Sequence, residues 1–490
     1  MAASPLFLVI LFCGLVRAAD VFAHFMVANT YNYTQTEWKA DVVAASEIGI
    51  DGFALNWGPP DCSLAPNNQD WYVARIEDAF AVAATNDFKL IYSFDMSYTP
   101  TACAIGWNTT FMATMISKYA NSPAAYIWNG DVLVSSYGGE GYGNNFFAEL
   151  KDVLAGEGVT ISLSPALTTY SLTAQGAGSN ANGVATGMLA NYTAIDGYLN
   201  WQTWPADTDT NLTAGVDVDF QAAFENAGRT GPYIMGVSPW QFKDFNDGYY
   251  NSWVEYSDVL FPNRWEQAIN TVQPDIVEII TWNDFEESHY IRDLPPVTGP
   301  AAVGFGVTGA YIYGQTHSAW QVMAQYYISW YKTGLAPKVK EDRVVFWYRV
   351  HPKEVPCSSG TNNIGVVRNS AYPSDAVFAW ALVSKNSTIS MNVGSNQNWT
   401  FEATTCGPTL NMVPFPTGID NAYPSVAIQR EEKTLHTAAG AVAIMEACAY
   451  ENYNPVVGLT GPALTARPKM GNGSGKNGKP KKPIYQKRAC

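Results

Sequence analysis

The sequence of 490 residues is poor in charge. Asp, Glu, Lys and Arg together make up 14% of it, against about 25% in an average globular domain. Acidic residues outnumber basic ones, and the formal net charge is −15. Proteins bind a polyanion such as nucleic acid through Lys and Arg, so this balance argues against a nucleic-acid partner.

The few basic residues are unevenly placed. Residues 466–490 contain eight basic residues and no acidic ones, which leaves 20 basic and 43 acidic residues, a net charge of −23, in the rest of the chain. This tail is rich in Gly, Pro and Lys and has almost nothing to bury. We therefore expect it to be disordered.

Long apolar runs are also absent. The one sustained run, residues 6–16, is too short to span a bilayer, and the small residues Ala18 and Ala19 follow it. That pattern is typical of a cleaved secretory signal, here residues 1–19. We expect no membrane partner and a secreted protein, extracellular or in a cell wall.

Cysteine is scarce, and removal of the signal leaves six of the seven cysteines. Cys62 and Cys103 form the natural pair in the first half of the chain. The other four allow three pairings and are Cys357, Cys406, Cys448 and Cys490. None of the spacings fits a zinc site. Sequons for N-glycosylation agree with export and occur at Asn32, Asn108, Asn191, Asn211, Asn386, Asn398 and Asn472.

Short apolar runs alternate with helical patterns from residue 20 to about residue 335. The runs that predict strands are residues 21–28, 52–57, 89–94, 124–130, 159–165, 196–204, 232–240 and 275–282. Residues 166–194 have the weakest pattern, and we expect a long loop with poor helix there. Eight such strands interleaved with helices predict an α/β fold, a (β/α)8 TIM-type barrel over residues 20–336.

Past residue 336 the pattern changes. Short alternating or β-branched runs are separated by Gly, Asn and Pro, which is typical of an antiparallel β-sandwich. We expect this C-terminal domain to cover residues 337–465, ahead of the basic tail.

Polar and aromatic residues end several of the predicted strands. Active sites of such barrels lie at the carboxyl ends of the strands, so these residues are candidates for binding substrate. The polar candidates are His24, Asn56, Asp95, Asn283 and His289. The aromatic candidates, whose flat rings suit sugar faces, are Trp57, Trp201, Trp240, Trp282 and Tyr290. For any single Trp, packing in a core is an equally good interpretation.

The stretch TWNDFEESHY, residues 281–290, concentrates acid at the end of the eighth predicted strand. Asp284 and Glu287 are three residues apart and share a side in a turn, whereas Glu286 points away. Two close carboxyl groups repel each other, so one can keep its proton as a general acid while the other stays ionised. Glycoside hydrolysis requires such a pair.

Two other interpretations of this stretch compete. Asp followed three residues later by Glu is close to a helix capping box, but no nearby cation neutralises these acids. A metal held by Glu286, Glu287 and His289 is a weaker alternative, and we expect no metal. The sequence contains neither a G-x-S-x-G nor an H-E-x-x-H motif. This argues against the nucleophilic serine of an α/β-hydrolase and against the zinc site of a metalloprotease.

Four motifs occur along the chain in the order of the predicted strands: FAHFMVANTYNYT, DGFALNWG, SFDMS and WNDFEESHY. They resemble glycoside hydrolase family 71, the fungal α-1,3-glucanases called mutanases, over roughly residues 20–465. The resemblance implies a secreted (β/α)8 hydrolase with an appended β-sandwich. Its substrate would be the α-1,3-glucan of fungal walls or bacterial mutan, cleaved with inversion and without a cofactor. We expect an endo-acting monomer.

The W-N-D/E-x-x-E motif also resembles the strand-end motif of the family 99 α-mannosidases, in which both acids are catalytic. The corresponding positions of this chain are Asp284 and Glu287, with Glu287 taken as general acid and Asp284 as base. Glu286 departs from the pattern as an extra acid. Two alternatives stay open: an α-glycosidase of another linkage or sugar, such as an α-mannosidase, and a non-catalytic glycoprotein that binds wall polysaccharide.

Overall fold

The structure is a computed structural model that describes residues 19–59, 70–97, 106–176, 178–245, 251–296, 305–355, 357 and 367–464. Almost all of the predicted signal, the predicted Cys62–Cys103 pair and the basic tail lie outside these residues. Within the described ranges, no helix combines the length and the apolar character needed to cross a membrane.

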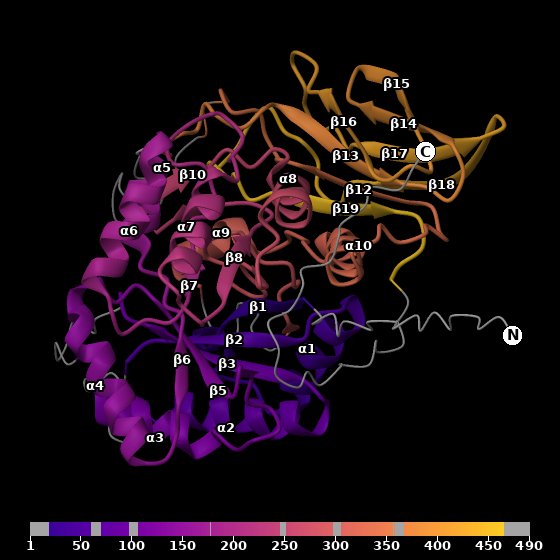
Figure 1. The fold of residues 1–490 in the computed structure, drawn as a ribbon. Coiled ribbons are helices and arrows are strands. Elements are labelled where there is room, and N and C mark those ends of the chain that lie inside the picture. Colours follow the sequence, from indigo (N-terminus) through magenta and orange to yellow (C-terminus); the bar gives the residue numbers. More distant parts are fainter. Residues whose placement is uncertain are drawn as a thin grey trace, which may run out of the picture.

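A curled sheet of parallel strands forms the N-terminal part of the molecule (Figure 1). Its strand order is β6-β5-β3-β2-β1-β11-β8-β7. The strands are β1 (Asp20–Met26), β2 (Gly52–Trp57), β3 (Lys89–Asp95), β5 (Asp131–Tyr137), β6 (Ile161–Leu163), β7 (Tyr198–Asn200), β8 (Tyr233–Val237) and β11 (Ile276–Ile279). Gly197 and Leu199 N–H donate to the carbonyls of Leu163 and Pro165 at 3.1 and 3.2 Å. Backbone hydrogen bonds therefore also join the two outermost strands.

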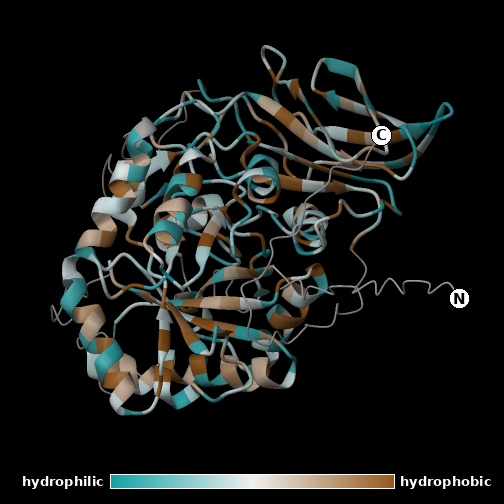
Figure 2. Ribbon diagram, in the orientation of Figure 1, coloured by the Kyte–Doolittle hydropathy of each residue, from teal (hydrophilic) through white to brown (hydrophobic). Residues whose placement is uncertain are grey.

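Both faces of this sheet are apolar, and Figure 2 shows its strands in the hydrophobic colours. One buried cluster takes a residue from, or just beyond, every strand: Phe22, Ala54, Ile91, Leu133, Ala166, Leu199, Ile234 and Ile276. Because side chains from all eight strands meet in one cluster, the sheet wraps around it.

Helices cover the outer face of the sheet (Figure 1). They are α1 (Gln35–Ile48), α2 (Asp70–Thr85), α3 (Thr109–Tyr119), α4 (Gly143–Gly156), α5 (Thr168–Gly176), α6 (Ala181–Asn191), α7 (Gly215–Asn226), α8 (Leu260–Gln267) and α10 (Trp320–Thr333); the short α9 (Gly309–Ile312) instead contacts the segment after β11. Local sequence explains some of their ends. Thr34 and Glu37 form a capping box at the start of α1, which satisfies backbone N–H groups that lack a partner within the helix.

Residues 166–194, expected to form a long loop with poor helix, contain the two helices α5 and α6, so the helical content is higher than predicted. The buried residues of α6 are Ala181, Ala185, Met188 and Leu189, which is the spacing of one helix face. Several of these side chains are small, and glycine lowers the helix propensity of the segment. Tertiary packing rather than local preference stabilises these helices.

The predicted fourth strand is also misplaced. Residues 124–130 contain only β4 (Ile127–Trp128), which pairs antiparallel with β5. Asn129 and Gly130 have φ values of +52° and +103°, so they form the tight turn that Asn-Gly favours between antiparallel strands. The parallel strand of the main sheet is therefore β5, and Tyr137 marks its carboxyl end.

Two antiparallel four-stranded sheets follow α10. The first has the order β16-β13-β12-β19 and the second β15-β14-β17-β18. Their bounds are β12 (Arg343–Tyr348), β13 (Ala376–Leu382), β14 (Ser387–Val393), β15 (Asn396–Ala403), β16 (Thr409–Pro414), β17 (Ser425–Arg430), β18 (Lys433–Ala439) and β19 (Val456–Thr460). Residues from both sheets, such as Val377 and Ile389, share one buried cluster. The disulfide Cys357–Cys448 is one of the pairings that the sequence leaves open.

The first of these sheets packs directly on α10. The rings of Trp320 and Trp347 lie 4.9 Å apart, and Trp380 Nε1 donates to the hydroxyl of Tyr327 at 3.2 Å. All four side chains belong to the same buried cluster as the outer face of the parallel sheet. The C-terminal sheets are thus joined to the rest of the molecule by a continuous core.

Candidate active site

The segment that follows β11 carries the two predicted catalytic acids. Asp284 N donates to Thr281 Oγ1 at 2.8 Å, and Glu287 N donates to Asp284 Oδ1 at 3.2 Å. The second bond is the one an N-cap residue makes, but residues 285–288 form a turn with no helix directly after it. The stretch is therefore not a helix capping box.

The carboxylate of Glu287 is held by three side chains. Lys243 Nζ lies 3.0 Å from Oε1, while Gln241 Nε2 and His289 Nε2 lie 3.3 and 3.2 Å from Oε2. Burial alone would raise the pKa of Glu287. The positive charge of Lys243 and the contact with His289 outweigh it and hold the pKa of Glu287 well below its usual value.

Lys243 reaches the site on a hairpin that follows β8. The hairpin consists of β9 (Phe242–Asp244) and β10 (Ser252–Val254). The Lys243 ammonium lies 4.0 Å from the centre of the Trp253 ring and 4.6 Å from that of Phe245. These cation–π contacts stabilise a buried cation and direct it toward Glu287. The sequence interpretation that no cation neutralises the acids is thus wrong, because the cation comes from 44 residues away.

The pKa of Asp284 is shifted in the opposite direction. Burial raises its pKa to about 6, His289 lowers it, and the negative charges of Glu287 and Glu286 raise it further. The side chains of Asp284 and Glu287 remain 15% and 25% exposed, so both can reach a bound molecule. The pair therefore combines a carboxyl that keeps its proton with one that loses it easily.

His289 lies between the two acids and is fully buried. Its Nδ1 is 3.2 Å from Thr281 Oγ1, and its ring stacks on that of Trp204 at 5.2 Å. Trp204 in turn donates from Nε1 to the carbonyl of Trp240 at 3.0 Å. These contacts fix the imidazole so that its Nε2 points at the acids.

Two aromatic side chains form a corner beside the acids. The rings of Tyr137 and Trp201 lie 4.7 Å apart at an angle of 61°. Burial raises the pKa of the Tyr137 phenol, and the charges of Glu287, Asp95, Glu140 and Asp284 raise it further. Tyr137 therefore remains a protonated hydrogen-bond donor in acidic surroundings.

His24 packs against Trp201, one of the two rings of this corner. Its ring lies edge-on to Trp201 at 4.7 Å, and its Nδ1 is 2.7 Å from Glu278 Oε1. Because His24 is fully buried, it holds Trp201 in place and does not face solvent. The contact of His24 with substrate stays a prediction, since its Nε2 has no hydrogen-bond partner among the described residues.

Asp95 and Asn56 lie at the same edge of the sheet. Asp95 is half-buried and stands beside Tyr137 in the register of β3 and β5. Asn56 is buried beside Met26 in the register of β1 and β2. Asp95 is thus close to the acid pair, whereas Asn56 is covered.

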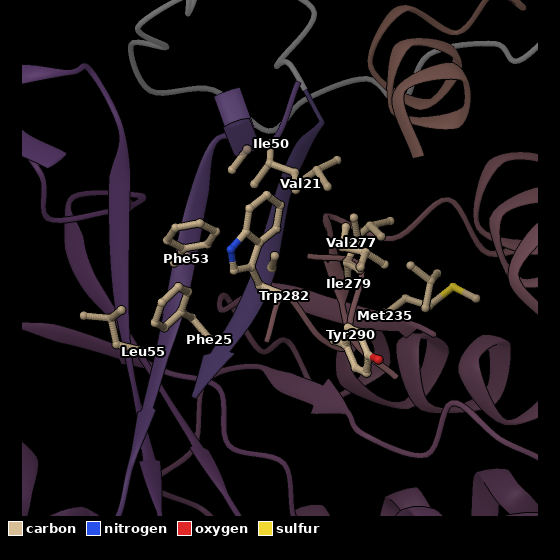
Figure 3. Close-up of a cluster of buried hydrophobic side chains, with 14 of the residues drawn as sticks. Val21, Phe25, Ile50, Phe53, Leu55, Met235, Val277, Ile279, Trp282 and Tyr290 are labelled. Atoms are coloured by element: carbon tan, nitrogen blue, oxygen red, sulfur yellow. The ribbon is translucent and has the colours of Figure 1, made fainter. Parts of the chain in front are cut away.

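Four predicted sugar-binding aromatics lie in cores and cannot stack on a substrate. Trp57 packs on Trp107, Trp240 donates to the carbonyl of Tyr453, and Tyr290 stacks on His317. Figure 3 shows Trp282 beside Phe25 and Phe53 among buried side chains. Each of these four side chains is covered by its neighbours, because an aromatic residue at or after a strand end packs against other parts of the chain as readily as it faces the site.

Two more polar residues of the segment bind other parts of the chain. Asn283 accepts from Met26 N at 2.7 Å and donates to Met26 O at 3.1 Å, which ties β1 to the end of β11. Both polar atoms of the Asn283 side chain thus bind Met26, and its contact with substrate stays a prediction. Glu286 turns away from the pair, and its Oε1 accepts a hydrogen bond from Thr308 at 2.8 Å.

A metal ion does not suit this cluster. Ligating atoms of Asp284, Glu287 and His289 lie within 4.8 Å of one another. The Lys243 ammonium at 3.0 Å from Glu287 would repel a divalent cation there. Glu286, part of the alternative metal set, is turned toward Thr308 instead.

Three residues of the site escape the sequence reasoning: Gln241, Lys243 and Tyr137. Tyr137 could have been found from the Asn-Gly turn, which moves the fourth strand to residues 131–137. Gln241 and Lys243 alternate in the short run QFKD, but nothing local indicates that this run folds onto Glu287.

Two close carboxyl groups with opposed pKa shifts, at the carboxyl end of parallel strands and beside a partly exposed indole, define a glycoside hydrolase. The comparison with protein families agrees, since the profile described as glycosyl hydrolase family 71 matches residues 17–468. The chain belongs to this family.

Individual relatives cover nearly the whole chain. It is 32% identical to the glucan endo-1,3-alpha-glucosidase agn1 of Schizosaccharomyces pombe, over 93% of this chain and 98% of the relative. It is 29% identical to a mutanase of Penicillium rubens, over 90% of this chain and 88% of the relative. Among solved structures, the GH99 endo-alpha-mannosidase of Bacteroides thetaiotaomicron has 10% identity and a TM-score of 0.44, over 64% of this chain and 98% of that one. This last likeness is too weak to carry weight.

Proposed function

We propose that this protein is a secreted, endo-acting hydrolase of α-1,3-glucan whose acid/base pair is Asp284 and Glu287. The observation that carries the proposal is the proximity of the two carboxyl groups, with oxygens within 4.8 Å of each other; burial raises the pKa of Asp284 and Lys243 lowers that of Glu287. The substrate rests on similarity, because the relatives above are named as a glucan endo-1,3-alpha-glucosidase and a mutanase. The reaction needs no cofactor, and the protein acts as a monomer on a polysaccharide.

The electrostatics favour roles opposite to those expected from the sequence. With a pKa of about 6, Asp284 carries a proton in mildly acidic medium and can give it to the glycosidic oxygen as the bond to the anomeric carbon breaks. Glu287 is ionised and can take a proton from the water that attacks that carbon. Tyr137 donates a hydrogen bond to the sugar, and Trp201 offers its face.

The reaction inverts the anomeric configuration, as the resemblance implies, because Glu287 activates the water that displaces the leaving group directly. Inverting glycosidases separate their carboxyl groups by about 6.5–9.5 Å to admit a water, and retaining ones by about 5–5.5 Å. One oxygen of Asp284 and one of Glu287 lie within 4.8 Å of each other; this bounds the nearest atoms and does not give the separation of the two carboxyl groups. NMR of the first product formed distinguishes the two outcomes: the β-anomer means inversion and the α-anomer retention.

We also infer the finer architecture. The curled sheet with its helices is a (β/α)8 barrel over residues 20–336, and the two antiparallel sheets are a β-sandwich over residues 337–465. The shared inner cluster and the backbone bonds between Gly197 and Leu163 support the barrel. Residues 1–19 direct secretion to the medium or the wall, and residues 466–490 are a basic tail.

The test uses the full chain from a secretory eukaryotic host and insoluble α-1,3-glucan. Wild type, Asp284→Asn and Glu287→Gln are compared by chromatography of released oligosaccharides. Because an acid or base group contributes about 10²- to 10⁴-fold, each variant should lose at least 10²-fold while keeping its circular dichroism. Glu286→Gln is the matched control, since it removes a neighbouring charge bonded to Thr308 and should lose far less.

An aryl glycoside with a good leaving group assigns the roles, because such a substrate needs little help from a general acid. Asp284→Asn should recover activity on it, and Glu287→Gln should not; the reverse result would restore the roles expected from the sequence. Near-wild-type release by both variants would rule out the pair. If the wild type releases nothing from α-1,3-glucan but cleaves an α-mannoside, the proposed sugar and linkage are wrong. Binding without any cleavage would favour the wall-binding glycoprotein.

A further inference from the structure

The hairpin of β9 and β10 presents one face of side chains to the site. Lys243 pairs with Trp253 in its register, and Glu255 N donates to Gln241 O at 3.0 Å, so Glu255 stands opposite Gln241. Side chains alternate along a strand, and opposite residues share a face. Gln241, Lys243, Trp253 and Glu255 therefore project from the same face of the hairpin, and two of them contact Glu287.

Two of these side chains keep a polar atom without a partner. Gln241 uses Nε2 to bind Glu287, but its Oε1 has no hydrogen-bond partner among the described residues, and neither has Glu255 Oε2. Gln241 is 2% and Glu255 8% exposed, so bulk water does not readily form a hydrogen bond with either atom. Opposite residues of a hairpin have Cβ atoms about 4.5–5.5 Å apart, which brings the amide and the carboxyl within reach of each other.

We propose that Glu255 is a positioning residue that, in its neutral form, donates its carboxyl proton to Gln241 Oε1 and so keeps Gln241 Nε2 on Glu287. The inference rests on the proposed catalytic role of Glu287. An amide has an acceptor at one end and donors at the other. Ionised Glu255 would have only acceptors, would attract Nε2, and would turn Oε1 toward the Glu287 carboxylate, where the two oxygens repel.

The charges around Glu255 are consistent with the neutral form. Burial raises the pKa of Glu255 to about 8, Asp207 raises it further, and Arg368 lowers it. Arg368 is itself paired with Asp207, and Lys243, the other charge on this hairpin face, is paired with Glu287. In acidic or neutral medium Glu255 therefore has a proton to donate.

Substitutions of Glu255 and Gln241, read out as activity, test this relay of hydrogen bonds from Glu255 through Gln241 to Glu287. Glu255→Met fills a similar volume without hydrogen bonding, whereas Glu255→Gln keeps an N–H donor that cannot ionise. We expect Glu255→Met to lower kcat on α-1,3-glucan about tenfold, as loss of one positioned hydrogen bond does, and Glu255→Gln to recover most of that loss. Gln241→Met should lower kcat similarly, and the double variant Gln241→Met with Glu255→Met should lose no more than Gln241→Met alone. Additive losses, or equal losses in both Glu255 variants, would overturn the proposal.

Thermal unfolding provides a readout that needs no substrate. Between the ordinary pKa of 4.5 and about 8, the folded state binds more protons at Glu255 than the unfolded state, so stability falls as pH rises through this window. The Tm of wild type relative to Glu255→Gln should therefore drop between about pH 5 and pH 8. A constant difference would show that Glu255 is not neutral in the folded protein and would overturn the relay. A drop combined with no cleavage of glucan by wild type would instead count against the proposed function alone.

Discussion

At the residue scale, the properties of Glu287 come from parts of the chain far from it in sequence. Lys243 and Gln241 hold its two carboxylate oxygens from the β9–β10 hairpin, and Lys243 is the main charge that lowers its pKa. Asp284, three residues away, has no Lys or Arg partner among the described residues, and burial raises its pKa to about 6 although His289 lowers it. Lys243 therefore contributes most to the contrast between the pKa values of the two carboxyl groups.

Lys243→Met tests this contrast. Without the ammonium, burial should raise the pKa of Glu287, so the base should become ionised only at higher pH. We expect kcat/KM to fall about 10- to 10²-fold at mildly acidic pH and the acidic limb of the pH–rate profile to move to higher pH. Lys118→Met, at a surface pair with Glu77, is the control and should leave the profile in place. An unshifted acidic limb in Lys243→Met would contradict the assignment.

The same pair predicts the alkaline limb of the wild-type enzyme. A general acid with a pKa of about 6 is protonated below that value and loses its proton above it. Activity on α-1,3-glucan should therefore decline as pH rises through about 6. Initial rates of sugar release across a pH series measure this, and an activity maximum well above neutrality would be incompatible with Asp284 as the proton donor.

At the element scale, one turn decides which residues face the site. Asn129 and Gly130 reverse the chain between β4 and β5 with positive φ values, and this reversal makes residues 131–137 the parallel strand. Tyr137 thereby reaches the carboxyl edge beside Asp95. The periodicity of residues 124–130 predicts a strand at that point of the chain, but apolar runs alone do not distinguish a short antiparallel strand from its parallel neighbour.

Gly130→Ala measures what the turn contributes. A Cβ at Gly130 meets nothing within 4 Å, but the φ of +103° is unfavourable for an L-residue, so we expect a loss of about 1–2 kcal/mol in the free energy of unfolding. Gly187 is the matched control: it lies inside α6 with open space around it, and Gly187→Ala should stabilise by about 0.5–1 kcal/mol. Denaturant titration monitors both, and equal effects of the two changes would contradict this account of the turn.

At the scale of the whole molecule, the parallel sheet and the C-terminal sheets share a core. Trp347 and Trp380 of the first antiparallel sheet belong to the same buried cluster as Trp320 and Tyr327 of α10. Nearly all of α10 is buried, because the parallel sheet lies on one side of it and the antiparallel sheet on the other. The C-terminal sheets therefore complete the fold of the catalytic part, whatever else they bind.

This shared core predicts that the two parts unfold together. Trp380→Ala should lower the free energy of unfolding by about 3–5 kcal/mol and should lower the melting temperature of the glucanase activity with it. Calorimetry and residual activity after heating test the coupling. A separate low-temperature transition that leaves activity intact would show that the C-terminal sheets are an independent unit.

The sequence by itself determined the alternation of strands and helices, the change to antiparallel strands after residue 336 and the acid-rich end of the eighth strand. These are local patterns of apolar spacing and side-chain chemistry, and they need no partner from elsewhere in the chain. Only the tertiary structure decided which Trp residues point into cores, which strand carries Tyr137, and that Lys243 and Gln241 hold Glu287. Those outcomes depend on contacts between residues distant in sequence, and the burial and charge that set a pKa exist only once those residues have come together.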